Sequence, residues 1–216
     1  MARRQQSSAL PAGTRQNRAW ETRQRMLDAA RDLFVANGYA ATTIEAIADR
    51  ASVAVQTIYF TFNNKRALLK ELVDVSVAGD QEPIPTLERP WVREAIAAPD
   101  AAGQLRRHAR GAREVYQRVG PVLEVVRSAA AADAYVASLW ETNKQQRYAI
   151  QVELAKALRT KPDYRGPSER RVLADILYSV LSPEMFFLLS TDRNWPLARC
   201  ERWLADVLCR QLTSPD

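Results

Sequence analysis

Few side chains in this 216-residue sequence combine in patterns that support catalysis. His108 is the only histidine, and Cys200 and Cys209 are the only cysteines. A single histidine leaves no His-rich metal site and one candidate for a His-assisted nucleophile. The sequence also contains no glycine-rich phosphate loop, no cluster of metal ligands and no nucleophile motif. We therefore expect no enzymatic activity, no cofactor and no bound metal.

The two cysteines are also poorly placed for a disulfide. They are nine residues apart, which on a helix corresponds to about 900° of rotation, so their thiols point to opposite faces. Two thiols do not make a disulfide framework. We expect buried, inert thiols, and a redox role for either one stays open.

The positive charge of the chain lies in its N-terminal third. Residues 1–70 contain 11 Lys/Arg and 5 Asp/Glu, whereas residues 71–216 contain 20 of each, so the first segment accounts for the net charge of +6. A basic end on a neutral body is typical of binding to a polyanion, with nucleic acid favoured over a membrane surface. A solvated basic tail without a partner would have the same composition.

Composition indicates a cytoplasmic protein without membrane association. The content of 47% hydrophobic and 26% charged residues is ordinary for a soluble globular chain. No apolar run approaches the roughly 18 residues needed to cross a bilayer. The arginine-rich first 25 residues lack the apolar core of a secretory signal.

Helical periodicity predicts an all-α fold. Apolar residues recur at three- and four-residue spacing, and no useful period-two alternation occurs. We expect a disordered basic arm over 1–18, a three-helix unit over 19–65, a connecting helix over 66–80 and a larger helical domain over 81–212. Within the larger domain, proline and glycine punctuation predicts helices near 88–98, 101–118, 121–131, 133–160, 168–190 and 196–212.

The segment 42–61 predicts two short helices joined by a tight bend. Asn37-Gly38 ends the preceding helix, and Thr42-x-x-Glu45 has the form of a capping box that opens the next. Ser52 is expected to cap the helix after it. Ile58 and Val53 then face inward, which leaves exposed Ala54, Val55, Gln56, Thr57 and Tyr59. This arrangement resembles a helix-turn-helix, in which the second helix of the pair enters the DNA major groove.

Two runs within about residues 23–70 carry a more specific pattern. The first is Ala30-x-x-Leu33-Phe34-x-x-x-Gly38-Tyr39-x-x-Thr42-Thr43. The second is Ile44-x-x-Ile47-Ala48, then Ser52-Val53-x-x-x-Thr57-Ile58-Tyr59-x-x-Phe62-x-Asn64-Lys65-x-x-Leu68-Leu69. Together they resemble the DNA-binding domain of the tetracycline-repressor (TetR) family. The later runs Leu181-Ser182-Pro183-Glu184 and Trp195-Pro196…Trp203-Leu204-Ala205 resemble the second domain of some members.

This resemblance implies DNA-binding roles for Thr43, Val55, Gln56, Thr57, Tyr59, Phe60 and Lys65. Thr43, Tyr59 and Lys65 would mainly contact phosphates. Gln56 could read an adenine edge bidentately, and Val55 or Thr57 could pack on a thymine methyl. The pairs Val55-Gln56 and Phe60-Thr61 depart from the common family pattern, so the operator sequence stays open.

The resemblance also implies a homodimer on an inverted-repeat operator, because one helix-turn-helix buries too little surface for tight specific binding. Apolar stripes within 169–190 and 196–212 are expected to pair across a two-fold axis. Aromatic residues of the middle helices could line a pocket for a small apolar or amphipathic ligand, although core packing is the alternative for each one. The candidates are Trp91, His108, Tyr116, Trp140, Tyr148 and Tyr178.

We therefore expect a homodimeric repressor of transcription that a small-molecule ligand releases from DNA, with the connecting helix 66–80 joining the two events. An activator would show the same features, so the sign of regulation stays open. The alternative is an all-α ligand-binding or scaffold protein whose N-terminal unit binds a protein partner. The confinement of net charge to residues 1–70 favours DNA.

Overall fold

The computed structural model describes residues 12–80 and 84–213, and within these ranges the chain is helical and has no β-strand beyond an isolated bridge between Tyr164 and Thr213. The prediction of an all-α fold is confirmed. The chain divides into two compact units, Met1–Leu72 and Val73–Asp216, and the division falls inside helix α4 (Lys65–Ala78). Each unit has its own helices and core.

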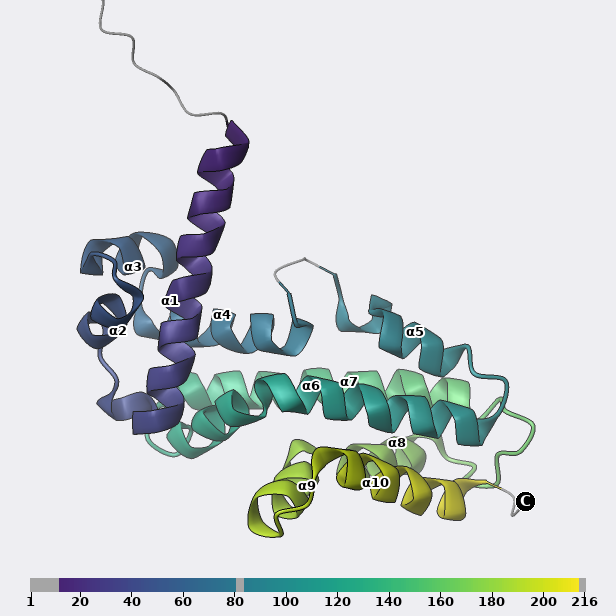
Figure 1. The fold of residues 1–216 in the computed structure, drawn as a ribbon. Helices are drawn as coiled ribbons and strands as arrows, with labels where there is room; N and C mark the ends of the chain where they lie inside the picture. Colours follow the sequence, from purple (N-terminus) through teal and green to yellow (C-terminus); the bar gives the residue numbers. More distant parts are fainter. Residues whose placement is uncertain (1–11, 81–83, 214–216) are drawn as a thin grey trace, which may run out of the picture. The chain divides into compact units, whose positions relative to one another are not determined.

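The first unit contains α1 (Ala12–Ala41), α2 (Ile44–Ala51), α3 (Val55–Phe62) and the beginning of α4 (Figure 1). Helix α2 packs against both α1 and α3. The apolar side chains spaced along these helices are buried, so burial of one face of each helix forms this small core. Its largest fully buried members are Met26, Leu27, Phe34, Ile47, Ile58, Leu68 and Leu69.

The arm predicted over 1–18 differs from the structure in part. Residues 1–11 lie outside the described residues, whereas residues 12–18 form the first turns of α1. Residues 12–18 contain no proline. Each of them can therefore supply the backbone N–H that a helix needs, and α1 extends toward the N-terminus.

The end of the first helix is confirmed at Gly38. This residue has φ 80° and ψ 165°, which breaks the helical geometry inside α1. Glycine alone adopts this region readily, because a Cβ would meet the backbone.

Two predicted helix caps are wrong by one or two residues. Thr43, rather than Thr42, is the N-cap of α2, and its Oγ1 accepts a hydrogen bond from Ala46 N at 3.1 Å. Thr42 is buried and donates instead to carbonyl oxygens of α1. Ser52 ends α2 in the left-handed conformation, with φ 54° and ψ 50°, and Ala54 precedes α3 without a side-chain cap. A side-chain cap therefore marks the start of α2, whereas α3 begins without one.

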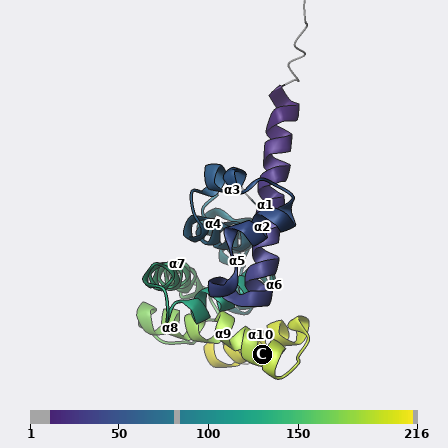
Figure 2. The same ribbon diagram turned by 90° about the vertical axis from the view of Figure 1, so that its left-hand side faces the viewer.

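The second unit is built on two long helices that contact each other, α6 (Ala101–Ala129) and α7 (Ala134–Leu158). Before them come a 3₁₀ turn, Thr86–Glu88, and α5 (Pro90–Ile96). After them come α8 (Arg170–Val180), α9 (Pro183–Phe187), a π-turn (Leu188–Asp192) and α10 (Leu197–Leu212). Figures 1 and 2 show α8 and α10 on the same side of the α6–α7 pair, with α8 packed on α7 and α10 on α6.

The predicted break at Gly120-Pro121 is wrong, because α6 continues through Pro121. Proline inside a helix costs about 3 kcal/mol. The neighbouring Val119, Val122 and Leu123 are fully buried, and burial of such side chains contributes about 1.5–3 kcal/mol each. Their burial outweighs the local cost of the proline.

The restart predicted at Ser182-Pro183 is confirmed. Ser182 accepts a hydrogen bond from Met185 N at 3.1 Å, and Pro183 occupies the first turn of α9. The segment Arg170–Asp192 is also long and apolar enough, by length and composition alone, to cross a membrane. This differs from the prediction that no run was long enough. Leu173, Leu177 and Leu181 within it belong to the core of the second unit, which accounts for the apolar composition.

Candidate nucleic-acid interface and ligand cavity

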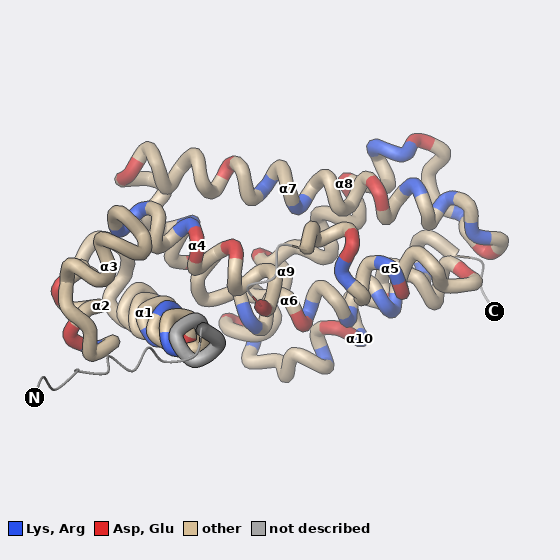
Figure 3. The backbone as a smooth tube through the Cα atoms, turned by 90° about the horizontal axis from the view of Figure 1, so that it is seen from above, with Lys and Arg blue, Asp and Glu red and all other residues tan. Residues whose placement is uncertain are grey.

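Helix α3 presents an uncharged, protruding face. Gln56 is exposed, Tyr59 is 47% exposed and Phe60 is 94% exposed, whereas Ile58 is fully buried. Val55 and Thr57 are half-buried at the edge of this face. Figure 3 shows no Lys, Arg, Asp or Glu on α3, while α1 carries several basic residues. An amide and two aromatic rings on a narrow helix suit the edges and methyl groups of bases.

The two residues predicted to contact phosphate at the flanks of α3 have partners inside the first unit. Thr43 is exposed, and its side chain caps α2. The Lys65 ammonium donates to Tyr39 O and Thr42 O, both at 2.8 Å, and lies 4.3 Å from the centre of the Tyr39 ring. Lys65 therefore binds the carbonyl end of α1, where a cation is favoured. This arrangement does not test the contact of Lys65 with phosphate that the resemblance implies.

A strained turn fixes the direction of the chain between α3 and α4. Asn63 has φ 68° and ψ −45°, and Asn64 N donates to Phe62 O at 2.8 Å, which is the pattern of a classic γ-turn. The Asn64 side chain then accepts from Ala67 N at 2.9 Å and caps α4. The turn and the cap thus join the end of α3 directly to the start of α4.

Ion pairs join the helices of the first unit. Arg23 on α1 makes a bidentate pair with Glu71 on α4, at 2.6 and 2.5 Å, and lies 5.0 Å from the Phe62 ring centre. Arg50 on α2 pairs with Asp32 on α1 at 2.8 Å, and this hydrogen bond lowers the pKa of the Asp32 carboxyl. Such pairs position the helices that support α3.

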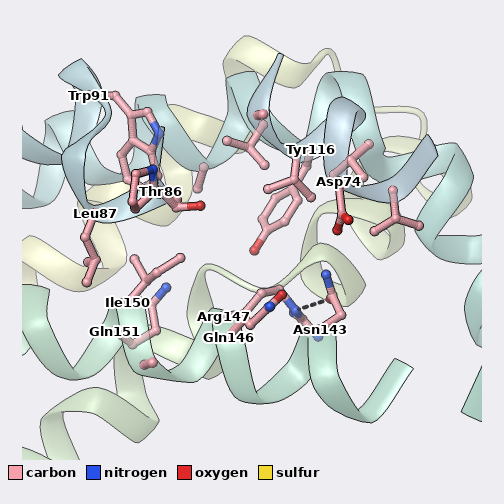
Figure 4. Close-up of a pocket in the computed structure, with 18 of the residues that line it drawn as sticks. Asp74, Thr86, Leu87, Trp91, Tyr116, Asn143, Gln146, Arg147, Ile150 and Gln151 are labelled. Carbon is pink, nitrogen blue, oxygen red and sulfur yellow. Dashed lines mark hydrogen bonds between the residues drawn. The ribbon is translucent and has the colours of Figure 1, made fainter. Parts of the chain in front are cut away.

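The second unit contains a cavity of about 500 Å³ (Figure 4). Its walls come from the C-terminal half of α4, residues 84–87, α5, α6 and α7, and every lining residue belongs to this unit. Most of the lining is apolar, including Val77, Val119 and Leu123. A cavity of this size accommodates a small organic molecule.

One helix supplies most of the polar lining. Asn143, Arg147 and Gln151 recur at four-residue spacing along α7 and therefore share one face of it. Asn143 and Gln151 are buried, and the Arg147 side chain is 11% exposed. Figure 4 shows these residues across the cavity from Tyr116. Sequence reasoning missed them, although their regular spacing was a visible signal.

Burial dominates the titration of the two polar aromatic residues on α6. It lowers the pKa of His108 to about 3, so this imidazole is neutral, and the ring stacks on Trp91 with centroids 6.2 Å apart. Burial also raises the pKa of Tyr116 to about 12, although nearby Arg147 opposes this shift. The Tyr116 hydroxyl donates to Leu181 O at 3.1 Å. The cavity therefore offers neutral aromatic groups beside one cation.

The six predicted ligand residues separate into two groups. Trp91, His108 and Tyr116 line the cavity. Trp140, Tyr148 and Tyr178 do not, and this part of the prediction needs correction. Trp140 and Tyr178 lie against the Arg147 guanidinium, at 5.4 and 5.2 Å from their ring centres, and Tyr148 donates to Asp175 at 2.9 Å.

The stripes predicted for dimerisation are divided between core and surface. Leu173, Leu177, Leu204 and Leu208 are buried within the unit. Val172 is 40% exposed and Trp203 is 42% exposed. Both α8 and α10 thus retain apolar surface beyond what the core covers. Cys200 and Cys209 are free thiols, and across residues 12–80 and 84–213 no group of three or more His, Cys, Asp or Glu side chains gathers to hold a metal.

Residues 26–72 match the family described as "Bacterial regulatory proteins, tetR family". The chain is 36% identical over 90 residues to the HTH-type transcriptional regulator SrpR of Pseudomonas putida, covering 38% of this chain and 40% of that protein. Another regulator of that species, TtgW, is matched at the same identity over 64% of its length. The chain thus spans less than two thirds of these curated relatives.

Solved structures extend the likeness to the whole fold. NalD of Pseudomonas aeruginosa, described as the secondary repressor of an efflux pump, has a TM-score of 0.70 at 17% identity, with 93% of this chain and 100% of that chain covered. A SmeT–triclosan complex has a TM-score of 0.68 at 17% identity, with 89% and 92% covered. At this identity the likeness establishes the fold alone.

Proposed function

We propose that this chain, which belongs to the tetracycline-repressor (TetR) family, is a homodimeric, sequence-specific repressor of transcription that a small ligand releases from DNA. The observation that carries the proposal is the face of α3. Gln56, Tyr59 and Phe60 protrude there from a helix whose other side is fully buried, within the segment that matches the family. Neighbouring exposed aromatic rings on one helix form an apolar surface of the kind that marks an interaction site.

In the proposed complex, α3 lies in the major groove. Gln56 reads an adenine edge, Val55 or Thr57 packs on a thymine methyl, and Phe60 makes apolar contact with the bases. Thr43, Tyr59 and the basic residues of α1 contact the backbone, which fixes register and supplies the salt-dependent part of the affinity.

Two copies of α3 are needed for an inverted repeat. The apolar surface left on α8 and α10, including Val172 and Trp203, is the proposed dimer interface. Paired across a two-fold axis, these helices would form a four-helix bundle.

Helix α4 is the proposed mechanical link. Its N-terminal half carries Leu68 and Leu69 in the core of the first unit, and its C-terminal half carries Val73 and Val77 in the cavity wall. A ligand that favours one position of α4 changes DNA affinity by the coupling factor between the two sites. The SmeT–triclosan complex supports a small amphipathic molecule as the effector. Function on DNA also makes the cytoplasm the proposed location.

A scaffold that binds a protein through α3 is the rival proposal, and the enzyme alternative has no support from a catalytic constellation. The experiment is selection of bound fragments from the source genome, followed by footprinting at physiological salt. We expect a short inverted repeat, with affinity that falls steeply as salt rises because counterions are released. Uniform weak binding to all DNA, or none, would favour the protein partner.

Substitution of the recognition helix sharpens the test. Gln56→Ala should reduce discrimination at one symmetric pair of base positions by about 5- to 150-fold, because a bidentate contact contributes about 1–3 kcal/mol. The matched control is Gln145→Ala, at an exposed glutamine of α7, which should leave the selected sequence unchanged.

A further inference from the structure

The cavity of the second unit contains a buried cation whose hydrogen bonds are incomplete. The Arg147 Nε donates to Asn143 Oδ1 at 3.1 Å, and Nη1 lies 3.7 Å from Glu184 Oε2, beyond good hydrogen-bond distance. The Nη2 atom is buried and has no hydrogen-bond partner among the described residues. A buried charged donor left without an acceptor is costly, so a ligand that supplies one gains affinity.

The surroundings of Arg147 hold the guanidinium in place. Trp140 and Tyr178 lie against it, with ring centres 5.4 and 5.2 Å from its central carbon. Cation–π contacts of this kind stabilise the charge and restrict its rotamer. Tyr116, which lines the cavity nearby, already donates its hydroxyl proton to Leu181 O. The Arg147 guanidinium is therefore held in place to donate a hydrogen bond to an acceptor that enters the cavity.

A second incomplete group lies one turn further along α7. Gln151 is 7% exposed, lines the cavity, and its Oε1 has no partner among the described residues. The opposite wall is apolar and aromatic, with Val119, Leu123 and Trp91. Asp74 is the acidic residue of the lining, but it is exposed, so solvent and salt screen its charge more than that of Arg147.

We infer that the ligand is an amphipathic anion: an aromatic or apolar body carrying a carboxylate or phenolate-type oxygen that binds Arg147 Nη2. The inference specifies the ligand class of the proposed effector site and so rests on the proposed function. Asn143 positions the guanidinium, and Gln151 accepts a hydrogen bond from a polar group on the body of the ligand.

Three probes of nearly equal size test the sign of the charge: 2-naphthoate, 2-naphthamide and 2-naphthylmethylammonium. Binding to the full chain is measured by titration calorimetry without DNA. We expect 2-naphthoate to bind about 10- to 100-fold more tightly than the amide, because a hydrogen bond to a charged group is at stake. The ammonium probe should bind most weakly.

Variants separate recognition from packing. Arg147→Gln should remove the preference for naphthoate over naphthamide, whereas the control Arg110→Gln, at an exposed arginine of α6, should keep it. Glu184→Gln removes the competing carboxylate, so it should increase naphthoate affinity. Glu184→Gln is informative because misfolding would not increase affinity. Circular dichroism checks the fold of each variant.

Several results would overturn the inference: equal binding of naphthoate and naphthamide, tightest binding of the ammonium probe, an unchanged preference in Arg147→Gln, or no binding of any probe at millimolar concentration. Footprinting without a probe separates this outcome from failure of the proposed function. If the chain binds its operator but shows no preference for naphthoate, only the inference of an anionic ligand is refuted. If the chain prefers naphthoate but binds no DNA, only the proposed repressor function is refuted.

Discussion

Replacement of Lys65 by methionine tests whether this residue acts on the fold or on DNA. Its ammonium donates to Tyr39 O and Thr42 O at 2.8 Å and lies over the Tyr39 ring. Hydrogen bonds from a charged donor contribute about 1.5–3 kcal/mol each. Because one half-buried ammonium makes both bonds, we count one at full value and expect Lys65→Met to destabilise the first unit by about 2–3 kcal/mol.

Hydrogen exchange followed by mass spectrometry measures this loss of stability in the full chain. Amides of α1 and α2 that exchange by opening of the first unit should exchange roughly 30- to 150-fold faster in Lys65→Met. Peptides from α6 and α7 should not change. The matched control is Lys70→Met, at an exposed lysine of the same helix, with little effect on either region.

The salt dependence of DNA binding tests the alternative, in which Lys65 contacts a phosphate. Each phosphate contact adds about 0.9 to the slope of log affinity against log salt, so a dimer that lost two Lys65 contacts would lose about 1.8. We expect the slope of Lys65→Met to change little. Unaltered exchange together with a slope reduced by about 1.8 would refute the reasoning and make Lys65 a phosphate contact.

Three further substitutions test other parts of the structure. Phe60→Ala should lower operator affinity while the melting temperature stays unchanged, because the ring is 94% exposed; a large fall in melting temperature would mean that the ring packs in the fold. Ser52→Gly should stabilise the first unit by about 0.5–1 kcal/mol in urea unfolding, since φ is 54° and glycine adopts it without strain; no gain would show that the serine side chain compensates. Because burial lowers the pKa of His108 from 6.5 to about 3, the unfolded chain binds more protons between these values, and the second unit should lose stability as pH falls below about 6.5. His108→Gln should flatten that loss, and the single histidine signal in NMR should not titrate between pH 8 and 5; a midpoint near 6.5 would contradict the burial.

Local features were readable from the sequence because they depend on the backbone preferences of a few neighbouring residues. Gly38 breaks the first helix since only glycine adopts its backbone angles readily, and Ser182-Pro183 starts a helix because a hydroxyl cap and a fixed φ favour that start. The helix-turn-helix was likewise visible in the spacing of apolar residues such as Ile47 and Ile58, which the structure buries. Periodicity alone made the all-α class clear.

Tertiary structure decided whatever depends on partners distant in the chain. Lys65 binds carbonyl groups 23 and 26 residues away, and no local pattern indicates that pairing. Pro121 stays inside α6 because its neighbours Val119, Val122 and Leu123 are buried, and that burial exceeds the cost of the proline. In the sequence, Arg147 looks like an ordinary helical arginine. Only the fold brings Trp140 and Tyr178 against its guanidinium and forms a cavity beside it. The sequence determines which helices form, whereas the chemistry of the ligand site arises only when packing removes these polar groups from water.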